Sequence, residues 1–205
     1  LMQNQNKTNV QSLRPPQTKG TTSAATSKTR ATNEQILCGD IDIHINYEGL
    51  WFHDGSPIGR IELVKLFSSI LEIDLDGHYW LCTPAEKVRI KVDDVPFQAV
   101  EVNTEGEGNN QNLIFRTNAD EYVIAGKDNP IRIETNQNTG EPTPYVMVRD
   151  GLEARLTRSV FYHLINQGVE RIVEESQVNN ITKEKVFGVW SMKQFFQIGK
   201  IPDEI

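Results

Sequence analysis

Two histidines and one aspartate near the start of the patterned part of the sequence could together bind a divalent metal. Asp42 and His44 lie on one segment and His53 on the next, and Glu48-Gly49 between them is typical of a two-residue hairpin turn. Such a turn would place His44 opposite His53 on one sheet face, with Asp42 two residues along. Two imidazoles and a carboxylate suit a divalent cation that serves metal-dependent hydrolysis. A shift of the pairing by one residue would separate the histidines and leave an ordinary solvated hairpin face.

The stretch GLWFHDGSPIGR, residues 49–60, offers a candidate anion site. Ser56 suits a helix N-cap and Pro57 the first helical position, so the pattern predicts a helix that starts here. Unpaired N–H groups at a helix start attract anions, Gly59 leaves room for a close approach, and Arg60 could contact the anion. No complete phosphate-loop or dinucleotide pattern accompanies these residues. The competing interpretation is a capped helix with an exposed arginine.

The segment KVRIKV, residues 87–92, carries a basic stripe in an acidic protein. Lys87 and Arg89 alternate with apolar residues and share one face of the predicted strand. With Pro84-Ala85 at the preceding turn, Trp80 lies across from Arg89, close enough for the guanidinium to stack on the indole. Such a surface could bind a phosphate together with a base. The alternative is a solvated sheet face with a single cation–π pair.

A second group of basic residues surrounds the hairpin signal Asp150-Gly151. The candidate ligand residues here are Arg116, Asn118, Arg149, Arg155 and Arg158. Arginine binds phosphate or carboxylate groups with two hydrogen bonds at once, so this group could hold an anion. Glu153 lies beside Arg155 on the same strand face, and an internal ion pair is therefore the competing interpretation, although Glu153 itself remains among the candidate site residues.

Hydrophobic periodicity predicts the elements that position these residues. Apolar residues at helical spacing follow Ser56 up to Leu71, and a second amphipathic helix begins after Thr157. Segments of alternating or continuous apolar character, typical of strands, fill most of the rest, and the chain closes with FGVWSMKQFFQI as one strand. The pattern predicts a strand-rich α+β fold with one amphipathic helix in each half.

The two halves of the sequence resemble one another. Asn46 followed by SPIGR is matched by Asn118 followed by NPIR, and the unit that begins at Tyr79 is matched by the unit that begins at Tyr145. The first copy then contains a helix where the second has a shorter strand and turn. A duplicated core is therefore predicted, with the binding surface between the copies, because domain junctions favour ligand clefts.

Composition and charge limit the classes of function. The chain has 205 residues and a net charge of −7, and the first 35 residues carry five basic side chains against one acidic, so +4 lies in that stretch and −11 in the rest. An acidic globular part would repel a polyphosphate backbone, which argues against general nucleic-acid binding. No apolar run is long enough to span a membrane, and no secretory signal is present, which favours the cytoplasm.

The two cysteines are far apart and form no disulfide framework or zinc motif, as expected of a reducing compartment. Cys82 lies in a predicted strand without a histidine neighbour, so nucleophilic catalysis has little support. No cofactor is expected.

The string CGDIDI…GLWFHDGSPIGR…YWLCTPAEK…DDVPF…FRTN…NPIR…GEPTPYVMVRDGLEARLTRSVFY…GVWS resembles an uncharacterised bacterial family, the domain of unknown function twelve eighty-five. The match runs from about residue 38 to residue 196 in the family's order. The resemblance implies a duplicated α+β core whose C-terminal domain is similar to a pleckstrin-homology fold. It also implies a nucleotide-like ligand at the domain interface and a role in signal transduction, without an established reaction.

We therefore expect a disordered polar tail over residues 1–35, an N-terminal α+β domain over residues 36–94 and a C-terminal pleckstrin-homology-like domain over residues 95–205. The expected function is non-catalytic: a sensor or adaptor that holds an anionic, nucleotide-like molecule between its halves. Two alternatives are a metal-dependent hydrolase built on His44, His53 and Asp42, and a protein-interaction module without a small ligand.

Overall fold

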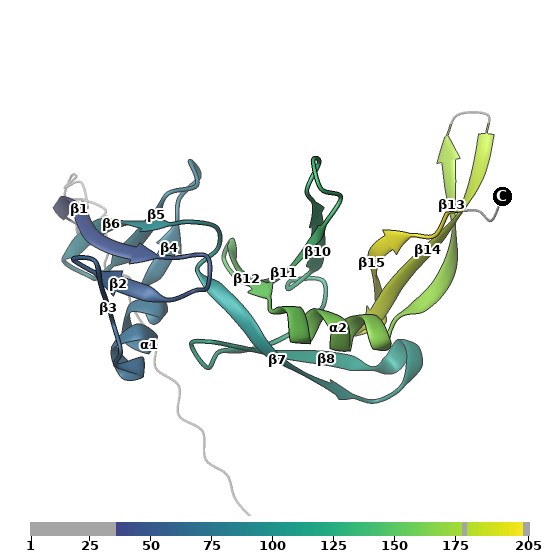
Figure 1. Cartoon of the computed structure of the whole chain (residues 1–205), viewed down its shortest axis with the longest axis horizontal. Coiled ribbons are helices and arrows are strands. Elements are labelled where there is room, and N and C mark those ends of the chain that lie inside the picture. Colours follow the sequence, from purple (N-terminus) through teal and green to yellow (C-terminus); the bar gives the residue numbers. More distant parts are fainter. Residues whose placement is uncertain (1–35, 178–179, 203–205) are drawn as a thin grey trace, which may run out of the picture. The chain divides into compact units, whose positions relative to one another are not determined.

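The computed structural model describes residues 36–177 and 180–202, so the predicted polar tail lies outside the described residues. Within them the chain forms three β-sheets and two α-helices, which confirms the α+β class and the strand-rich character. Figure 1 shows the first sheet in purple and blue, the second in teal and green, and the third in light green and yellow. Buried apolar side chains of both larger sheets and both helices belong to one core cluster, which includes Trp51, Phe97 and Leu164.

The first half of the described chain forms one six-stranded sheet with one helix. Its elements are β1 (Ile36–Ile45), β2 (Trp51–His53), β3 (Ser56–Pro57), α1 (Ile61–Ser69), β4 (Leu71–Ile73), β5 (Tyr79–Cys82) and β6 (Glu86–Val92). The strand order is β3-β2-β1-β6-β5-β4, with β1 and β6 parallel in the centre. Ile43 and Ile45 of β1 are buried, as the alternating pattern predicts, and Trp51 stacks on Phe67 of α1 at a ring distance of 5.9 Å.

The second sheet also has six strands. Its elements are β7 (Phe97–Glu105), the 3₁₀ turn η1 (Gly108–Asn110), β8 (Asn112–Thr117), β9 (Tyr122–Ile124), β10 (Ile131–Thr135), β11 (Pro142–Arg149) and β12 (Leu152–Leu156). The order β10-β11-β12-β7-β8-β9 places β7 and β12 parallel in the centre. In each sheet the first three strands run in order from the centre to one edge, and the last three run in order from the opposite edge back to the centre. This shared connectivity is what a duplication predicts. Asn46 and Asn118 are not equivalent, however, because one follows the first strand of its sheet and the other follows the second.

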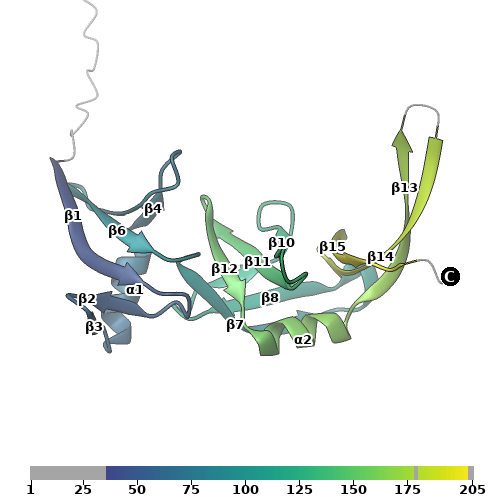
Figure 2. The ribbon, with the colours of Figure 1, turned by 45° about the horizontal axis from the view of Figure 1, so that its top comes forward.

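The chain ends with a helix and a third, three-stranded sheet, visible in both ribbon views (Figures 1 and 2). These elements are α2 (Arg158–Asn166), β13 (Val169–Gln177), β14 (Asn180–Ser191) and β15 (Gln194–Lys200). Thr157 takes the predicted N-cap position of α2, although its side chain makes no capping bond, and Val160 and Leu164 are buried, as predicted. No helix in the described part of the chain is long and apolar enough to cross a bilayer.

The predicted final strand is wrong, because FGVWSMKQFFQI turns back on itself. Met192 and Lys193 form the turn between β14 and β15, and both have positive φ angles, 49° and 63°. Two left-handed residues give the backbone of a type I′ hairpin turn, which usually contains Asn or Gly. The sequence carries neither residue here, and the turn is therefore missing from the pattern.

The predicted start of the first helix is also wrong. Ser56 and Pro57 pair with β2 as a short strand, and the helix begins at Ile61 with Arg60 as an N-cap that makes no side-chain capping bond. Asp54 and Gly55, with φ angles of 47° and 72°, form the tight turn that sends the chain back along β2. Asp-Gly is a strong hairpin signal, and here it outweighs the Ser-Pro helix signal.

Candidate functional site

Asp93 and Asp94 directly follow β6. Asp93 contacts a residue of the first half of the chain, and Asp94 contacts residues of the second half. His44 Nε2 in β1 lies 2.8 Å from an Asp93 carboxylate oxygen, although its angle falls outside hydrogen-bond geometry, and this contact holds the pKa of Asp93 below its ordinary value. The Asp94 carboxylate accepts hydrogen bonds from the Tyr145 hydroxyl at 3.2 Å and from Arg155 Nη1 at 3.3 Å. The connection between the two larger sheets is therefore held from both sides.

Further contacts join the β1–β2 turn to the second sheet. Asn118 Nδ2 donates to the Gly49 carbonyl at 2.8 Å, and Gln98 Nε2 donates to the Tyr47 carbonyl at 2.9 Å. Arg155 donates to the same Tyr47 carbonyl and lies over the Tyr47 ring. Gly49 has a φ of 69°, and a Cβ atom there would lie 2.8 Å from Asn118 Nδ2, so this close approach requires glycine.

A cavity of about 430 Å³ lies at this junction, between α1, the turn that joins β8 to β9, and the end of β11. Its lining residues are Lys65, Ser69, Ala119, Asp120, Glu121 and Arg149. Volumes of about 300 to 1,000 Å³ are usual for small-molecule sites. The cavity combines two cationic and two carboxylate side chains, contributed by both halves.

Lys65 and Asp120 form the tighter of the two ion pairs in the cavity. Lys65 Nζ lies 2.8 Å from Asp120 Oδ2, and Arg116 Nη1 lies 3.1 Å from Asp120 Oδ1. These contacts raise the pKa of Lys65 and lower the pKa of Asp120. Arg116 also donates to Glu101 at 2.8 Å, so its guanidinium is occupied within the second half.

Arg149 lies on the other side of the same cavity and reaches across the junction. Its Nη2 donates to the Ser68 carbonyl near the end of α1, and its guanidinium lies 5.5 Å from the centre of the Phe97 ring. Nη1 lies 3.3 Å from Glu121 Oε2, but it is buried and has no hydrogen bond among the described residues. Burial raises the pKa of Glu121, although the positive charge of Arg149 opposes this shift. The Arg149 and Glu121 side chains are therefore close, but Arg149 Nη1 lacks a hydrogen bond among the described residues.

The predicted arginine group is only partly brought together. Arg116, Asn118, Arg149 and Arg155 all lie at or near the junction, yet only Arg149 lines the cavity. Arg158 is exposed at the start of α2 and makes no hydrogen bond or ion pair with the described residues.

The ion pair between Glu153 and Arg155, which was the competing interpretation, does not form. Glu153 accepts two hydrogen bonds from Arg132 at 2.7 and 2.6 Å, in the fork geometry that arginine favours. Arg155 binds Asp94 instead.

Gly59 and Arg60 directly precede the first helix, with Arg60 as its N-cap, and anion binding at this helix start stays a prediction. Both residues are exposed, no atom lies within 4 Å of a Cβ placed on Gly59, and neither lines the junction cavity. Since the helix begins only at Ile61, the N–H groups at its start lie further along than Ser56.

The basic stripe on β6 has the predicted register but a different ring contact. Trp80 is paired with Arg89, as the Pro84-Ala85 turn predicts, but it is Lys87 Nζ that lies over the indole, 4.8 Å from its centre. Arg89 lines a separate cavity of about 310 Å³ together with Asp40 and Lys91. This basic surface is therefore distinct from the junction.

The predicted metal pair is wrong because the β1–β2 register differs by one residue. His44 is opposite Phe52, and His53 is opposite Ile43. The turn spans more residues than Glu48-Gly49, because the Asn46 side chain accepts hydrogen bonds from two backbone N–H groups within it, those of residues 48 and 50. The two histidines consequently lie on opposite faces of the strand pair.

Sequence profiles of two domains match the chain. The N-terminal domain of unknown function (DUF1285) matches residues 34–95, and the C-terminal domain of the protein of unknown function (DUF1285) matches residues 96–198. The chain belongs to the DUF1285 family. The family resemblance found in the sequence is thus confirmed, together with a two-domain architecture.

A solved structure agrees with this assignment. A DUF1285 family protein from Silicibacter pomeroyi DSS-3 is 41% identical, with 87% of this chain and 92% of that chain covered and a TM-score of 0.70. A second DUF1285 family protein, from Shewanella baltica OS155, is 26% identical over 60% of this chain and 90% of that chain, with a TM-score of 0.48. No curated protein matches the chain.

Sequence reasoning missed three of the charged residues that line the cavity of this DUF1285 protein. Lys65, Asp120 and Glu121 lie on α1 and on the turn between β8 and β9. The only local signal is a polar stripe on the predicted helix, where Lys65 and Ser69 are spaced by one helical turn. Nothing in the sequence pairs that stripe with the turn at Asp120.

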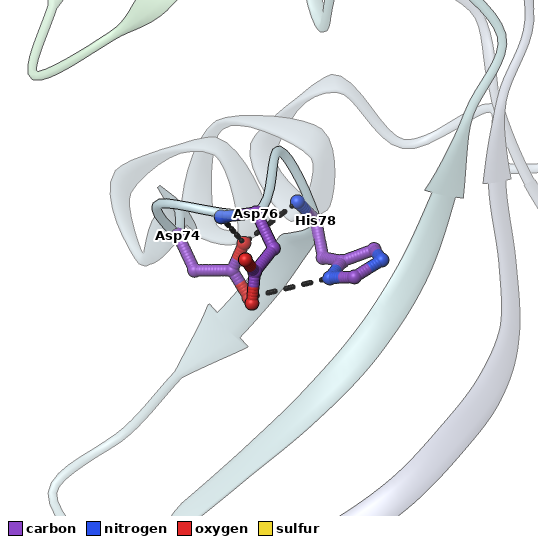
Figure 3. A group of neighbouring side chains, drawn as sticks. All are labelled: Asp74, Asp76 and His78. Carbon is purple, nitrogen blue, oxygen red and sulfur yellow. Dashed lines mark hydrogen bonds and ion pairs between the residues drawn. The ribbon is translucent and has the colours of Figure 1, made fainter.

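The same DUF1285 protein contains an acidic cluster that the sequence reading also missed. Asp74, Asp76 and His78 place possible metal-ligating atoms within 4.8 Å of one another in the turn between β4 and β5 (Figure 3). Asp74 already accepts hydrogen bonds from the N–H groups of Asp76 and His78, at 3.0 and 2.8 Å, and from the Trp80 indole at 2.8 Å. These three hydrogen bonds use most of the acceptor sites of the Asp74 carboxylate. The three side chains therefore lie together because Asp74 closes the turn between β4 and β5.

Proposed function

We propose that this DUF1285 protein is a non-catalytic binding module that holds a small anionic, nucleotide-like ligand in the junction cavity. The observation that carries the proposal is the pair of cations, Lys65 and Arg149, which come from different halves of the chain and line one cavity of about 430 Å³. Lysine and arginine side chains bind carboxylate and phosphate oxygens.

The surroundings of Cys82 and His44, whose side chains are of the types that often act as nucleophile and base, support a role without catalysis. Burial raises the pKa of the Cys82 thiol to about 11, which disfavours the reactive thiolate at neutral pH. His44, on β1, has its Nε2 atom 2.8 Å from an Asp93 carboxylate oxygen, and it does not line the junction cavity.

A sensor or adaptor role is supported by the position of the cavity. A ligand that contacts Lys65, Asp120 and Arg149 would add bonds between α1 and the second sheet. A ligand that binds one arrangement of the junction more tightly than another would shift the population toward that arrangement. The proposal also includes a cytoplasmic location and a pleckstrin-homology-like character of the C-terminal half.

A thermal-shift screen followed by calorimetric titration tests the proposal. The probes are AMP, ADP, ATP and cyclic nucleotides. A ligand at about a hundred times its Kd stabilises the folded protein by roughly 2.7 kcal/mol, so a specific ligand should raise the melting temperature.

Variants connect such a shift to the cavity. Lys65→Gln and Arg149→Gln should weaken binding, whereas Arg158→Gln, on an exposed arginine outside the cavity, should not. Absence of binding by every compound would overturn the proposal, as would binding that neither cavity variant changes.

A protein-interaction module is the second candidate, favoured by a different surface. Tyr122, Ile124 and Met192 are 66%, 42% and 56% exposed, and all three line a separate cavity of about 420 Å³ beside the edge strand β9. Exposed apolar groups around a hollow often mark a binding surface. Loss of a co-purifying protein in the Ile124→Asp variant would support this candidate.

A further inference from the structure

We propose that the first sheet carries a second binding site, in which Arg89 and Lys91 of β6 hold the phosphate group of a small molecule. The site is the cavity of about 310 Å³ between β1 and β6, which shares no lining residue with the junction cavity. The inference therefore goes beyond the proposed function and does not depend on it. It is carried by an arginine that lines a cavity without a partner of its own.

The alternation of β6 places its basic side chains on one face of the first sheet. Ile90 is 5% exposed and belongs to the hydrophobic core, and Val88 packs against the same core. Successive side chains of a strand point to opposite faces of the sheet. Arg89 and Lys91 therefore lie together on the face that is turned away from this core.

The cavity lies where the pairing of β1 with β6 is irregular. The two strands are neighbours in the centre of the first sheet (Figures 1 and 2). Asp40 is opposite Arg89 and His44 is opposite Lys91, so β1 advances further than β6 between these two pairs. Extra residues in one strand interrupt the ladder and bend the strand. The residues that line the hollow at this interruption are Asp40, Ile41, Arg89, Ile90 and Lys91.

Arg89 is an available cation in this cavity. It makes no hydrogen bond, ion pair or ring contact with the described residues, although its side chain is only partly exposed. None of its nitrogen atoms is among the buried atoms that lack a partner, so the unpaired donors are open to solvent. A guanidinium carries five N–H donors in a planar fork that matches two oxygens of a phosphate group. A ligand can therefore reach these donors and pair with them.

Lys91 adds a second cation to the same cavity. Its Nζ lies 3.6 Å from Asp93 Oδ1, and its side chain is 74% exposed. The same Asp93 oxygen also lies 2.8 Å from His44 Nε2. Exposed ion pairs stabilise a protein little, so Lys91 can contact a ligand in the cavity at small cost.

The charges of the cavity suit a phosphate group. Arg89 and Lys91 supply two positive charges and Asp40 supplies one negative charge, which leaves a net positive charge in the lining. A phosphate ester carries between one and two negative charges at neutral pH and several acceptor oxygens. At about 0.1 M salt, charges more than about 10 Å away are largely screened. The acidic side chains elsewhere in the chain therefore oppose binding less than the two cations in contact favour it.

The test is a backbone amide NMR titration of the full chain with inorganic phosphate and with glycerol 3-phosphate. Sodium chloride at the same ionic strength is the control for a general salt effect. Either phosphate probe should give saturable shift changes centred on the amides of Arg89, Ile90 and Lys91. The probe that binds more tightly tells whether the ligand is the free ion or an ester. Equal changes with sodium chloride, or no saturable change at these amides, would overturn the proposal.

Three variants connect the binding to the cavity. Arg89→Gln should weaken phosphate binding about tenfold or more, because it removes a charged, two-pronged donor. Arg158→Gln, on an exposed arginine outside the cavity, should leave the affinity unchanged. Asp40→Asn should strengthen binding about two- to fivefold, since it removes the negative charge of the lining. Phosphate that binds Arg89→Gln as tightly as the original protein would overturn the proposal and leave the proposed function standing.

Discussion

Arginine side chains connect the halves of this protein at the scale of single residues. Arg155 binds the Asp94 carboxylate and the Tyr47 carbonyl, and Arg149 binds the Ser68 carbonyl. The rigid fork of a guanidinium lets one side chain satisfy groups on several elements at once. The sequence analysis predicted that these arginines hold an anionic ligand or pair with Glu153, whereas in the structure they contact Asp94, Glu121 and two backbone carbonyls.

One residue-scale prediction concerns the acidity of Asp74. Hydrogen bonds from the His78 N–H first, and then from the Trp80 indole, lower its pKa from 3.8 to about 2. Trp80→Phe removes the indole donor, so the pKa of Asp74 should rise toward 3.8. NMR titration of the side-chain carboxyl measures this value, with Trp190→Phe as the control. An Asp74 pKa that stays at about 2 in Trp80→Phe would contradict this account of the turn.

The sign of the pH dependence follows from the lowered pKa. Because folding lowers the pKa of Asp74, the ionised carboxylate stabilises the folded protein at pH values above 3.8, and this contribution is lost as the pH falls through about 2. Trp80→Phe should therefore make the free energy of unfolding depend less on pH in this range. Denaturant titrations at several acidic pH values measure the difference.

At the scale of elements, local turn chemistry decided where prediction succeeded. The Pro84-Ala85 turn left one register for β5 and β6, and the structure has that register. The β1–β2 register failed because the Asn46 side chain lengthens the turn, a bond that the residue pattern alone does not reveal. The Met192-Lys193 turn had no signal because neither residue is typical of positive φ.

Glycine in β14 offers an element-scale prediction. A Cβ atom on Gly188 would lie 2.3 Å from the Phe196 carbonyl oxygen, where β14 and β15 approach closely. Gly188→Ala should therefore lower the free energy of unfolding by about 1 to 3 kcal/mol, the usual cost of overpacking. Gly199→Ala, at a position with no neighbouring atom within 4 Å, is the control and should stay within about 0.5 kcal/mol. Equal stability of the two variants in urea titrations would be the contrary result.

At the scale of the whole described chain, the candidate site depends on contacts that no local pattern contains. Lys65 meets Asp120, and Arg149 meets the Ser68 carbonyl, across the junction of the two halves. One part of the duplication could be read from the sequence, because the units that begin at Tyr79 and Tyr145 take matching places as β5–β6 and β11–β12, whereas Asn46 and Asn118 do not. The contacts between the two halves could not be predicted, since the partners of Lys65 and Arg149 are distant in sequence and lie on elements with ordinary helix and turn patterns.

Asn118 provides a prediction at this scale. Its side chain donates to the Gly49 carbonyl at 2.8 Å and accepts from the Gln98 N–H at 3.1 Å, and so links the halves. Asn118→Ala should lower the free energy of unfolding by about 1 to 3 kcal/mol, because it leaves partly buried backbone groups without partners. Asn103→Ala, at an exposed asparagine whose side chain donates a hydrogen bond to Glu101 of its own strand, should have little effect. Urea titrations compare the two, and a harmless Asn118→Ala would show that this link does not support the junction.

A ligand in the junction cavity would change the surroundings of the backbone amides that line it. Backbone amide NMR spectra recorded during addition of the strongest binder among the nucleotides detect such changes. We expect the largest shift changes at the amides of Ser69, Asp120 and Arg149, with loss of those changes in Arg149→Gln. Changes centred instead on the separate cavity at Arg89, or no changes with any compound, would contradict ligand binding in the junction cavity.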